Sequence, residues 1–277
     1  MPDKGLKIVV KRPTPQDRKL YEDLRVRFEQ FRRDTILAAG VIHESNAETI
    51  AARVRNTEIG LAYELVRGLS RVRDEPIVRD FPLCQTGETC VPHSVANGLL
   101  GLSESSFFGR DRSDRKAAVN MFIDHFLATE PGHDRGERRS LDRVHHYFST
   151  HSQRGLGLEE SFRFELTGSL LDMVFALYSE DAFLLVVTRA HCLLAYGLSV
   201  SDGQAYVEVK DPLLAAAKGY ELGLFAERFC WSALGGLPYA VSLGATYDPA
   251  GALKLIEDQR ARGNLGVLCS SGILRRA

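Results

Sequence analysis

A cysteine, a histidine and an aspartate in this chain have the order that a cysteine-nucleophile enzyme requires. Cys90 precedes a short apolar segment, VPHSVANGLLGL, and His191 and Asp211 lie much further along on two β-rich segments. In such enzymes a thiolate attacks a carbonyl carbon, an imidazole transfers protons and a carboxylate orients the imidazole. The three residues therefore predict nucleophilic chemistry, and they say much less about the substrate.

A thiol must be ionised to attack, and the surroundings of Cys90 favour this. An ordinary cysteine, with a pKa of about 8.5, is mostly protonated at neutral pH, and a helix N-terminus or a nearby imidazolium lowers that pKa. Pro92 is tolerated in a first helical turn. The apolar face continues through Val95, Leu99 and Leu100. We therefore expect Cys90 to begin a buried helix.

The segments that carry His191 and Asp211 are predicted to be the two strands of a hairpin. HCLLAYGLSV (191–200) and QAYVEVKD (204–211) are separated by Ser-Asp-Gly, a good hairpin turn. The turn brings positions near 211 back beside 191–193, where a carboxylate can fix the tautomer of the imidazole.

An acyl-transfer site also needs hydrogen-bond donors for the oxyanion. Gln85 lies five residues before Cys90, and its amide could join the backbone N–H of Cys90. Gly87 would let the intervening loop turn tightly. Gln85 is therefore the fourth candidate site residue.

Taken together, Gln85, Cys90, His191 and the run VKDPL resemble the papain-like cysteine peptidases. The resemblance covers about 85–234 and is strongest to two bacterial branches. One is the bacteriocin-leader-cleaving peptidase domains of export transporters, and the other is the effector proteases and deamidases that pathogens inject into host cells. The resemblance implies that Cys90 is the nucleophile, His191 the base, Asp211 the orienting group and Gln85 the oxyanion donor.

The chain departs from papain itself in several places. Val91 stands where papain has a Trp, and the Gln is one residue closer to the Cys. The third triad member is Asp before Pro instead of Asn in an Asn-Ser-Trp run. The segment between nucleophile and base is long and helical. These departures exclude papain and the cathepsins themselves.

The expected activity is hydrolysis of an amide bond in a protein or peptide, as by a cysteine protease. One alternative is a glutamine deamidase or transglutaminase-type effector acting on a host protein, because that chemistry also passes through a thioester. Another is a non-catalytic helical interaction protein with a degenerate peptidase fold. No cofactor or metal is expected in any of these cases.

Several interpretations of single residues stay open in the sequence. Cys90 could be an inert buried thiol or a redox partner of Cys84, and Asp211 could simply be a strand-end carboxylate in a turn. His93, one helical turn after Cys90, could be the base or a zinc ligand. Cys192 is expected to point away from the site, because neighbouring strand residues face opposite sides.

The pattern of elements predicts an α+β fold. The resemblance implies that this fold is papain-like, with the nucleophile helix packed on an antiparallel sheet. We expect an N-terminal helical extension at 1–80, which recognises a protein target or covers the site, and a catalytic domain at 81–277. Helices are expected at 15–39, 45–72, 113–129, 138–150, 167–179 and 249–263, and strands at 6–10, 182–187, 191–200, 204–211 and 239–247.

Composition sets limits on partners and compartment. The formal net charge is −1, which gives no case for nucleic-acid binding. Five cysteines in 277 residues are too few and odd in number for a disulfide scaffold, so a reducing compartment is expected. No apolar run is long enough for a membrane span or a signal peptide. We expect the bacterial cytoplasm, or delivery into a host cell by a route independent of a signal peptide.

Overall fold

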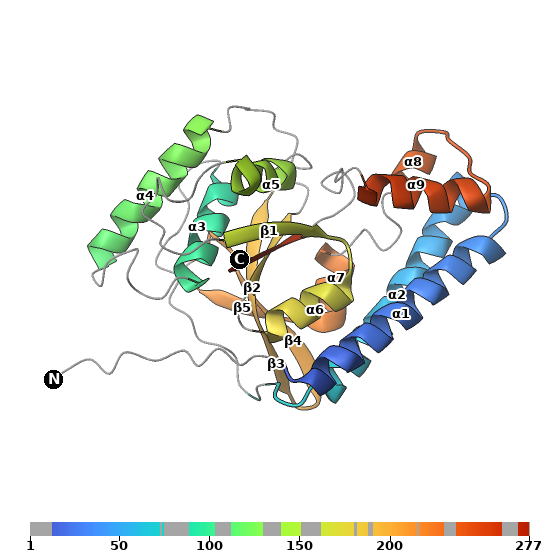
Figure 1. Cartoon of the computed structure of the whole chain (residues 1–277), viewed down its shortest axis with the longest axis horizontal. Coiled ribbons are helices and arrows are strands. Elements are labelled where there is room, and N and C mark those ends of the chain that lie inside the picture. The colour runs from blue at the N-terminus through green and yellow to red at the C-terminus, as the bar shows by residue number, and fades with distance from the viewer. Residues whose placement is uncertain are drawn as a thin grey trace.

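The computed structural model is α+β, with helices on both faces of one antiparallel sheet (Figure 1). The residues that it describes are 13–72, 74, 89–102, 112–129, 140–150, 162–179, 182–187, 191–214, 216–229, 237–261 and 271–276. Within these ranges the sheet has six strands in the order β1-β6-β2-β3-β4-β5. This confirms the α+β class, while the papain-like identity of the fold stays a prediction.

The described helices are α1 (Pro15–Ala38), α2 (Glu44–Gly68), α3 (Cys90–Leu102), α4 (Arg112–Thr129), α5 (Ser140–Thr150), α6 (Leu170–Tyr178), α7 (Leu222–Phe229), α8 (Leu237–Ser242) and α9 (Pro249–Ala261). The strands are β1 (Phe162–Thr167), β2 (Ala182–Val187), β3 (Cys192–Ser201), β4 (Gln204–Lys210), β5 (Ala217–Glu221) and β6 (Ser271–Arg276).

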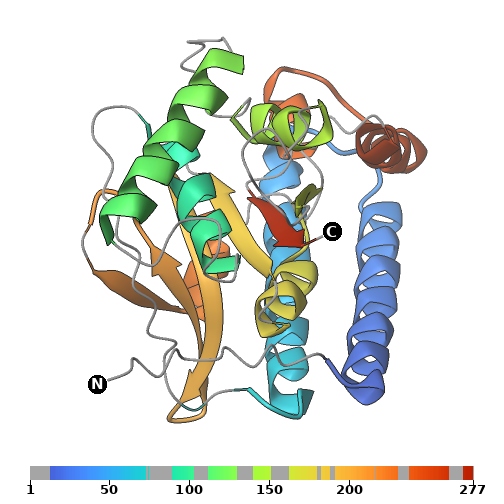
Figure 2. The same ribbon diagram turned by 60° about the vertical axis from the view of Figure 1, so that its left-hand side comes forward.

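The sheet separates two apolar clusters, and β2 contributes to both. Ala182, Leu184 and Val186 pack with the helices of one face, α1, α2, α6 and α7. Phe183 and Leu185, which point the other way, pack with α3, α4 and α5. Figures 1 and 2 show the sheet between these two layers of helices. Because both faces are covered, the strand is a continuous apolar run instead of an alternating one.

The two N-terminal helices belong to the same core as the sheet. Leu24 and Phe28 of α1 are buried in one cluster with residues of α6 and β2. Asp17, which is 1% exposed, accepts hydrogen bonds from Thr14, Ser70 and Tyr178 and so joins α1 to the segment after α2 and to the end of α6. Burial alone would raise the pKa of Asp17, but these bonds outweigh it and lower the pKa to about 2. The division at residue 80 stays a prediction.

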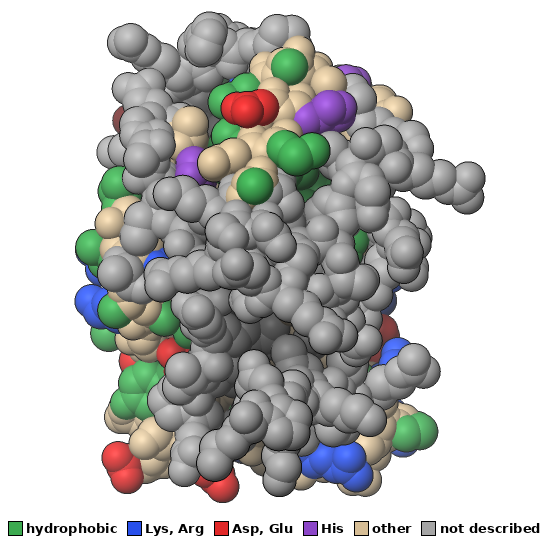
Figure 3. Space-filling view, turned by 90° about the vertical axis from the view of Figure 1, so that its left-hand side faces the viewer, with side chains coloured by type: hydrophobic (Ala, Val, Ile, Leu, Met, Phe, Trp, Pro, Cys, Tyr) green, Lys and Arg blue, Asp and Glu red, His purple; other side chains and the backbone are tan. Residues whose placement is uncertain are grey.

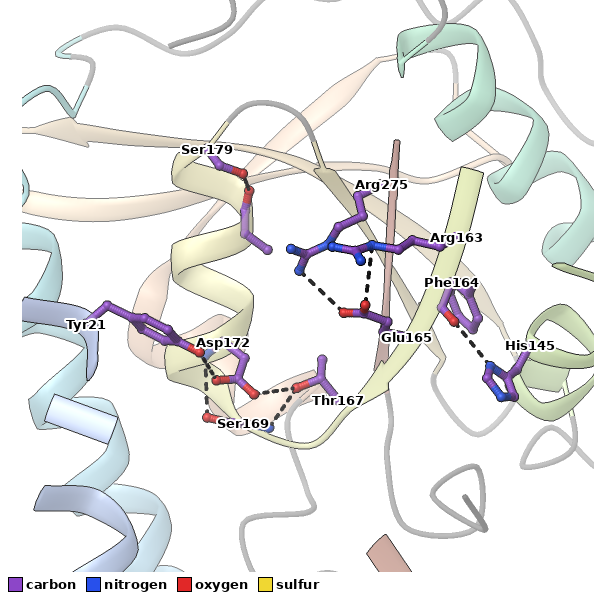
Figure 4. A network of polar contacts seen from close by, with 11 residues as sticks. Tyr21, His145, Arg163, Phe164, Glu165, Thr167, Ser169, Asp172, Ser179 and Arg275 are labelled. Atoms are coloured by element: carbon purple, nitrogen blue, oxygen red, sulfur yellow. Dashed lines mark hydrogen bonds and ion pairs between the residues drawn. The ribbon is translucent and has the colours of Figure 1, made fainter. Parts of the chain in front are cut away.

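A second buried carboxylate joins α2 to the start of α6. Glu58 Oε1 accepts the backbone N–H of Leu170 at 2.7 Å and the hydroxyl of Ser169 at 3.0 Å. Tyr21 of α1 donates to Asp172 Oδ1 in the first turn of α6 at 2.6 Å (Figure 4). Burial raises the pKa of Glu58 to about 7. The N-terminal helices are thus attached to α6 by polar contacts as well as by apolar packing.

The structure corrects one predicted strand and adds three that were not expected. Residues 239–247 do not form a strand, because 237–242 is helix α8 and only Tyr247 makes an isolated bridge, to Ile42. The strands β1, β5 and β6 were not predicted. The strand expected at 6–10 lies outside the described residues.

The outermost described helix on the α3 side is α4, which packs on α3. It exposes the side chains of Met121 and Leu127, at 67% and 42%. Figure 3 views the molecule from this side, where apolar and charged side chains and histidines lie near one another. Across the described ranges, every helix is too short or too polar to cross a membrane.

Candidate active site

Cys90 is the first residue of α3, as its sequence neighbours predicted. The carbonyl of Thr89 accepts the backbone N–H of His93 at 3.1 Å, which places Thr89 at the N-cap of the helix. The first turn of a helix leaves backbone N–H groups without intrahelical acceptors. Pro92 has no N–H, so the donors at this end are those of Cys90 and Val91. The thiol therefore lies beside hydrogen-bond donors and at the positive end of the helix dipole.

Helix α3 is fixed against the sheet by close packing. A Cβ atom on Gly98 would lie 3.0 Å from Leu274 Cδ2 and 3.3 Å from Leu194 Cδ1. Glycine at this position lets the helix approach β3 and β6 closely. Val95 and Leu99, on the apolar face of the helix, are fully buried. The position of Cys90 relative to β3 is thus set by the core.

Ser94 ties the first turns of α3 to the start of β3. Its hydroxyl donates to the carbonyl of Cys192 at 3.1 Å, across 98 residues of sequence. Ser94 lies one helical turn after Cys90, and Cys192 directly follows His191. This bond therefore holds the nucleophile and the base in register. Ser94 was not among the predicted site residues, although its spacing of four from Cys90 places both on one helix face.

His191 and Asp211 are brought together by the β3–β4 hairpin. His191 Nε2 lies 2.6 Å from Asp211 Oδ1, and the two side chains are 18% and 27% exposed. The hairpin turns at Asp202 and Gly203, both with positive φ, as the Ser-Asp-Gly sequence predicted. Between the turn and the site, the pairing of β3 with β4 shifts by one residue, at Ala195–Gly197.

The imidazole of His191 also contacts the thiol. A hydrogen bond to Cys90 and the bond to Asp211 raise the pKa of His191 to about 9, although burial acts in the opposite direction. Because Nε2 faces the carboxylate, we infer that Nδ1 is the nitrogen that faces the sulfur. An imidazole with this pKa is protonated at neutral pH. The arrangement can therefore hold a thiolate–imidazolium pair.

Cys192 does not point away from the site as expected. It is fully buried in the same apolar cluster that Cys90 packs against. Alternation fails as a guide because β3 begins at Cys192, so His191 precedes the strand. Burial, and next the charge of Cys90, raise the pKa of Cys192, with a hydrogen bond to Ser94 acting against them. Of the two cysteines in the described residues, Cys90 is thus the candidate nucleophile.

His93 is engaged elsewhere. Its Nδ1 lies 2.8 Å from the carbonyl of Thr89, and the side chain is 7% exposed. Burial lowers the pKa of His93, which makes the ring a neutral donor to that carbonyl. His191, and not His93, is therefore the histidine that the structure pairs with a carboxylate beside Cys90. In the part of the chain that is described, no three His, Cys, Asp or Glu side chains form a metal-binding group.

Asp211 has both of the roles that the sequence left open. Its Oδ1 accepts the bond from His191 and also the backbone N–H of Leu213 at 2.8 Å. It is thus a turn carboxylate and the partner of the imidazole at once. Gln85 and Cys84 lie outside the described residues, so the oxyanion role of Gln85 and the redox pairing of Cys84 stay predictions.

No protein-family model, curated protein sequence or solved structure matches this chain. The contacts among Cys90, His191 and Asp211 are therefore the basis for inferring a function.

Proposed function

We propose that the chain is a thiol hydrolase that attacks an amide bond of a protein or peptide through Cys90, His191 and Asp211. One observation carries the proposal: a single imidazole contacts a carboxylate at 2.6 Å and a thiol at a helix N-terminus. This is the arrangement that nucleophilic cysteine catalysis requires. The bacterial papain-like resemblance remains part of the same proposal.

In the proposed reaction, the sulfur of Cys90 forms a bond to the amide carbonyl carbon with its own electron pair, and the π electron pair of the C=O bond moves to the oxygen. The resulting oxyanion accepts hydrogen bonds from backbone N–H groups at the start of α3, and Gln85 is the proposed further donor. His191 gives its proton to the leaving nitrogen as the C–N bond breaks, which leaves a thioester on Cys90. A water molecule, deprotonated by His191, then releases the acid. Asp211 holds the imidazole in place throughout.

Peptide cleavage and glutamine deamidation share these steps and differ in the amide that is presented. Cleavage releases a peptide amine, whereas deamidation releases ammonia from a side chain. Cleavage is the main proposal, and deamidation of a host protein is the alternative outcome of the same chemistry. Intact-mass measurement separates them, because cleavage yields fragments and deamidation yields a full-length product with an amide replaced by an acid. Cys90→Ser should abolish either product.

The nucleophile can be tested without a substrate. Iodoacetamide at about pH 6 alkylates thiolates, and an ordinary cysteine is almost entirely protonated there. We expect Cys90 to be labelled selectively over the other four cysteines, and the labelling to be lost in His191→Ala. His146→Ala, at an exposed histidine on α5, is the matched control and should leave labelling unchanged. Equal labelling of all cysteines, or none at Cys90, would overturn the proposed nucleophile and favour a non-catalytic interaction protein.

A further inference from the structure

Lys210 is a buried cation next to the residue that orients His191. It is the last residue of β4, and it is 1% exposed. Its ammonium group donates a hydrogen bond to the carbonyl of Leu214. A buried ammonium is costly unless its hydrogen bonds are satisfied. The position of this group is therefore expected to have a structural or functional reason.

The bond from Lys210 spans the turn that contains Asp211. The carbonyl of Asp211 accepts the backbone N–H of Leu214 at 3.0 Å, and Asp211 Oδ1 accepts that of Leu213 at 2.8 Å. Pro212 restricts the backbone between them. The conformation of 211–214 thus fixes the direction of the same carboxylate oxygen that lies 2.6 Å from His191 Nε2.

Little else in the described residues holds the far end of this turn against the sheet. Pro212 is buried, but Leu213 and Leu214 are 58% and 52% exposed, so their side chains bury little apolar surface there. The bond from Lys210 to Leu214 is a direct link between the end of the turn and strand β4.

We propose that Lys210 is a positioning residue that presents the Asp211 carboxylate to His191 by holding residues 211–214 against β4. The proposal rests on the proposed function only in taking Cys90 and His191 as the reacting pair. Asp211 and Cys90 are two groups that interact with the His191 ring, and buried Cys192 lies close to Cys90. Lys210 acts on this set through Asp211, which lies next to it in the chain.

The test is the variant Lys210→Met, which keeps the length of the side chain and removes the ammonium. His191 is titrated by NMR, and iodoacetamide labelling of Cys90 is followed over the same pH range. We expect the pKa of His191 to fall from about 9 toward 6.5. If the pKa of His191 falls by one pH unit, the ratio of the thiolate–imidazolium pair to the neutral thiol–imidazole pair falls about tenfold. Labelling of Cys90 near neutral pH should slow accordingly. Lys218→Met, at an exposed lysine on β5, is the matched control.

A double variant separates positioning from stability. If Lys210 acts through Asp211, Lys210→Met should change the pKa of His191 by much less in an Asp211→Asn background than in the wild type. A lower melting temperature with the pKa of His191 still near 9 would overturn the proposal. If Lys210→Met does not fold, Lys210→Arg and Lys210→Gln take its place. The Arg variant keeps a charged hydrogen-bond donor, so His191 should have a higher pKa in it than in the Gln variant. Equal pKa values of His191 in the two variants would overturn the proposal. The NMR titration does not require a reactive thiol, so it can fail separately from the labelling test of Cys90.

Discussion

Removing the carboxylate with Asp211→Asn is expected to lower the pKa of His191. Contacts with Cys90 and Asp211 raise this pKa from 6.5 to about 9 against the effect of burial, and the hydrogen bond to Cys90 is the largest single cause. The difference corresponds to about 3 kcal/mol in favour of the imidazolium. An opposite charge in contact changes a pKa by about 1–3. We therefore expect His191 to titrate at about 6–8 in Asp211→Asn.

Removing both partners makes the expectation sharper. In Cys90→Ala combined with Asp211→Asn, burial is the main remaining influence, and burial lowers the pKa of His191. The pKa should then fall below 6.5. The two variants thus bracket the separate contributions of the thiol and the carboxylate.

The measurement is an NMR titration of the histidine ring signals, with the signal of His191 assigned by its loss in His191→Gln. Asp124→Asn, at an exposed aspartate on α4, is the control and should leave the titration unchanged. A pKa that stays near 9 in Asp211→Asn would show that the carboxylate does not hold the imidazole, and would refute the orienting role.

The same pKa predicts how stability depends on pH. Because the folded-state pKa of His191 is raised, its contribution is complete below pH 6.5 and is lost as the pH rises through about 9. Urea unfolding across this range should show a contribution of up to about 3 kcal/mol that disappears at the alkaline end. Asp211→Asn should make this loss smaller.

Two further substitutions test the core. Burial raises the pKa of Glu58 from 4.5 to about 7, so ionisation of this carboxyl group lowers the stability of the fold as the pH rises through that range. Glu58→Gln should therefore increase the free energy of unfolding at about pH 8 by up to about 3 kcal/mol. An unchanged free energy in urea unfolding would contradict this. A Cβ on Gly272 would lie 2.1 Å from Phe164 Cζ, so Gly272→Ala should destabilise the protein by about 1–3 kcal/mol. A Cβ on Gly60 in helix α2 would meet no atom of the described residues within 4 Å, so Gly60→Ala should stabilise the protein in thermal unfolding by up to about 1 kcal/mol.

Elements with a strong local pattern could be predicted from the sequence. The helix expected at 15–39 is Pro15–Ala38, started by Thr14 and Pro15, and the strand expected at 182–187 is Ala182–Val187. The hairpin that joins His191 to Asp211 was also predicted, because its turn chemistry is local.

Elements that depend on distant neighbours were missed. The strand β6 has a short apolar stretch, and it becomes a strand by pairing with β1 and β2, about a hundred residues earlier. Residues 239–247 contain an apolar pattern that suggested a strand. Leu237 and Val241, four residues apart, are both buried, which is the spacing of helix α8.

The candidate site likewise has features that the sequence predicted and features that depend on distant neighbours. The roles proposed for Cys90, His191 and Asp211 could be inferred from residue type and order. The link from Ser94 to β3 and the burial of Lys210 do not, because each depends on what covers the α3 face of the sheet. The pattern at 204–211 predicted alternating faces, but not that Glu208 and Lys210 on the polar face would be buried as well.

The position of β6 has a consequence for how the protein is made. This strand, Ser271–Arg276, comes after all the other described strands in the chain, yet it lies inside the sheet between β1 and β2. Leu274 is also the nearest contact of Gly98 in α3. A nascent chain that has not yet reached this strand lacks both an interior strand of the sheet and part of the surface on which the Cys90 helix rests. The proposed site is therefore expected to assemble only after translation has passed residue 276, which would delay the reactive thiol until the rest of the fold can close around it.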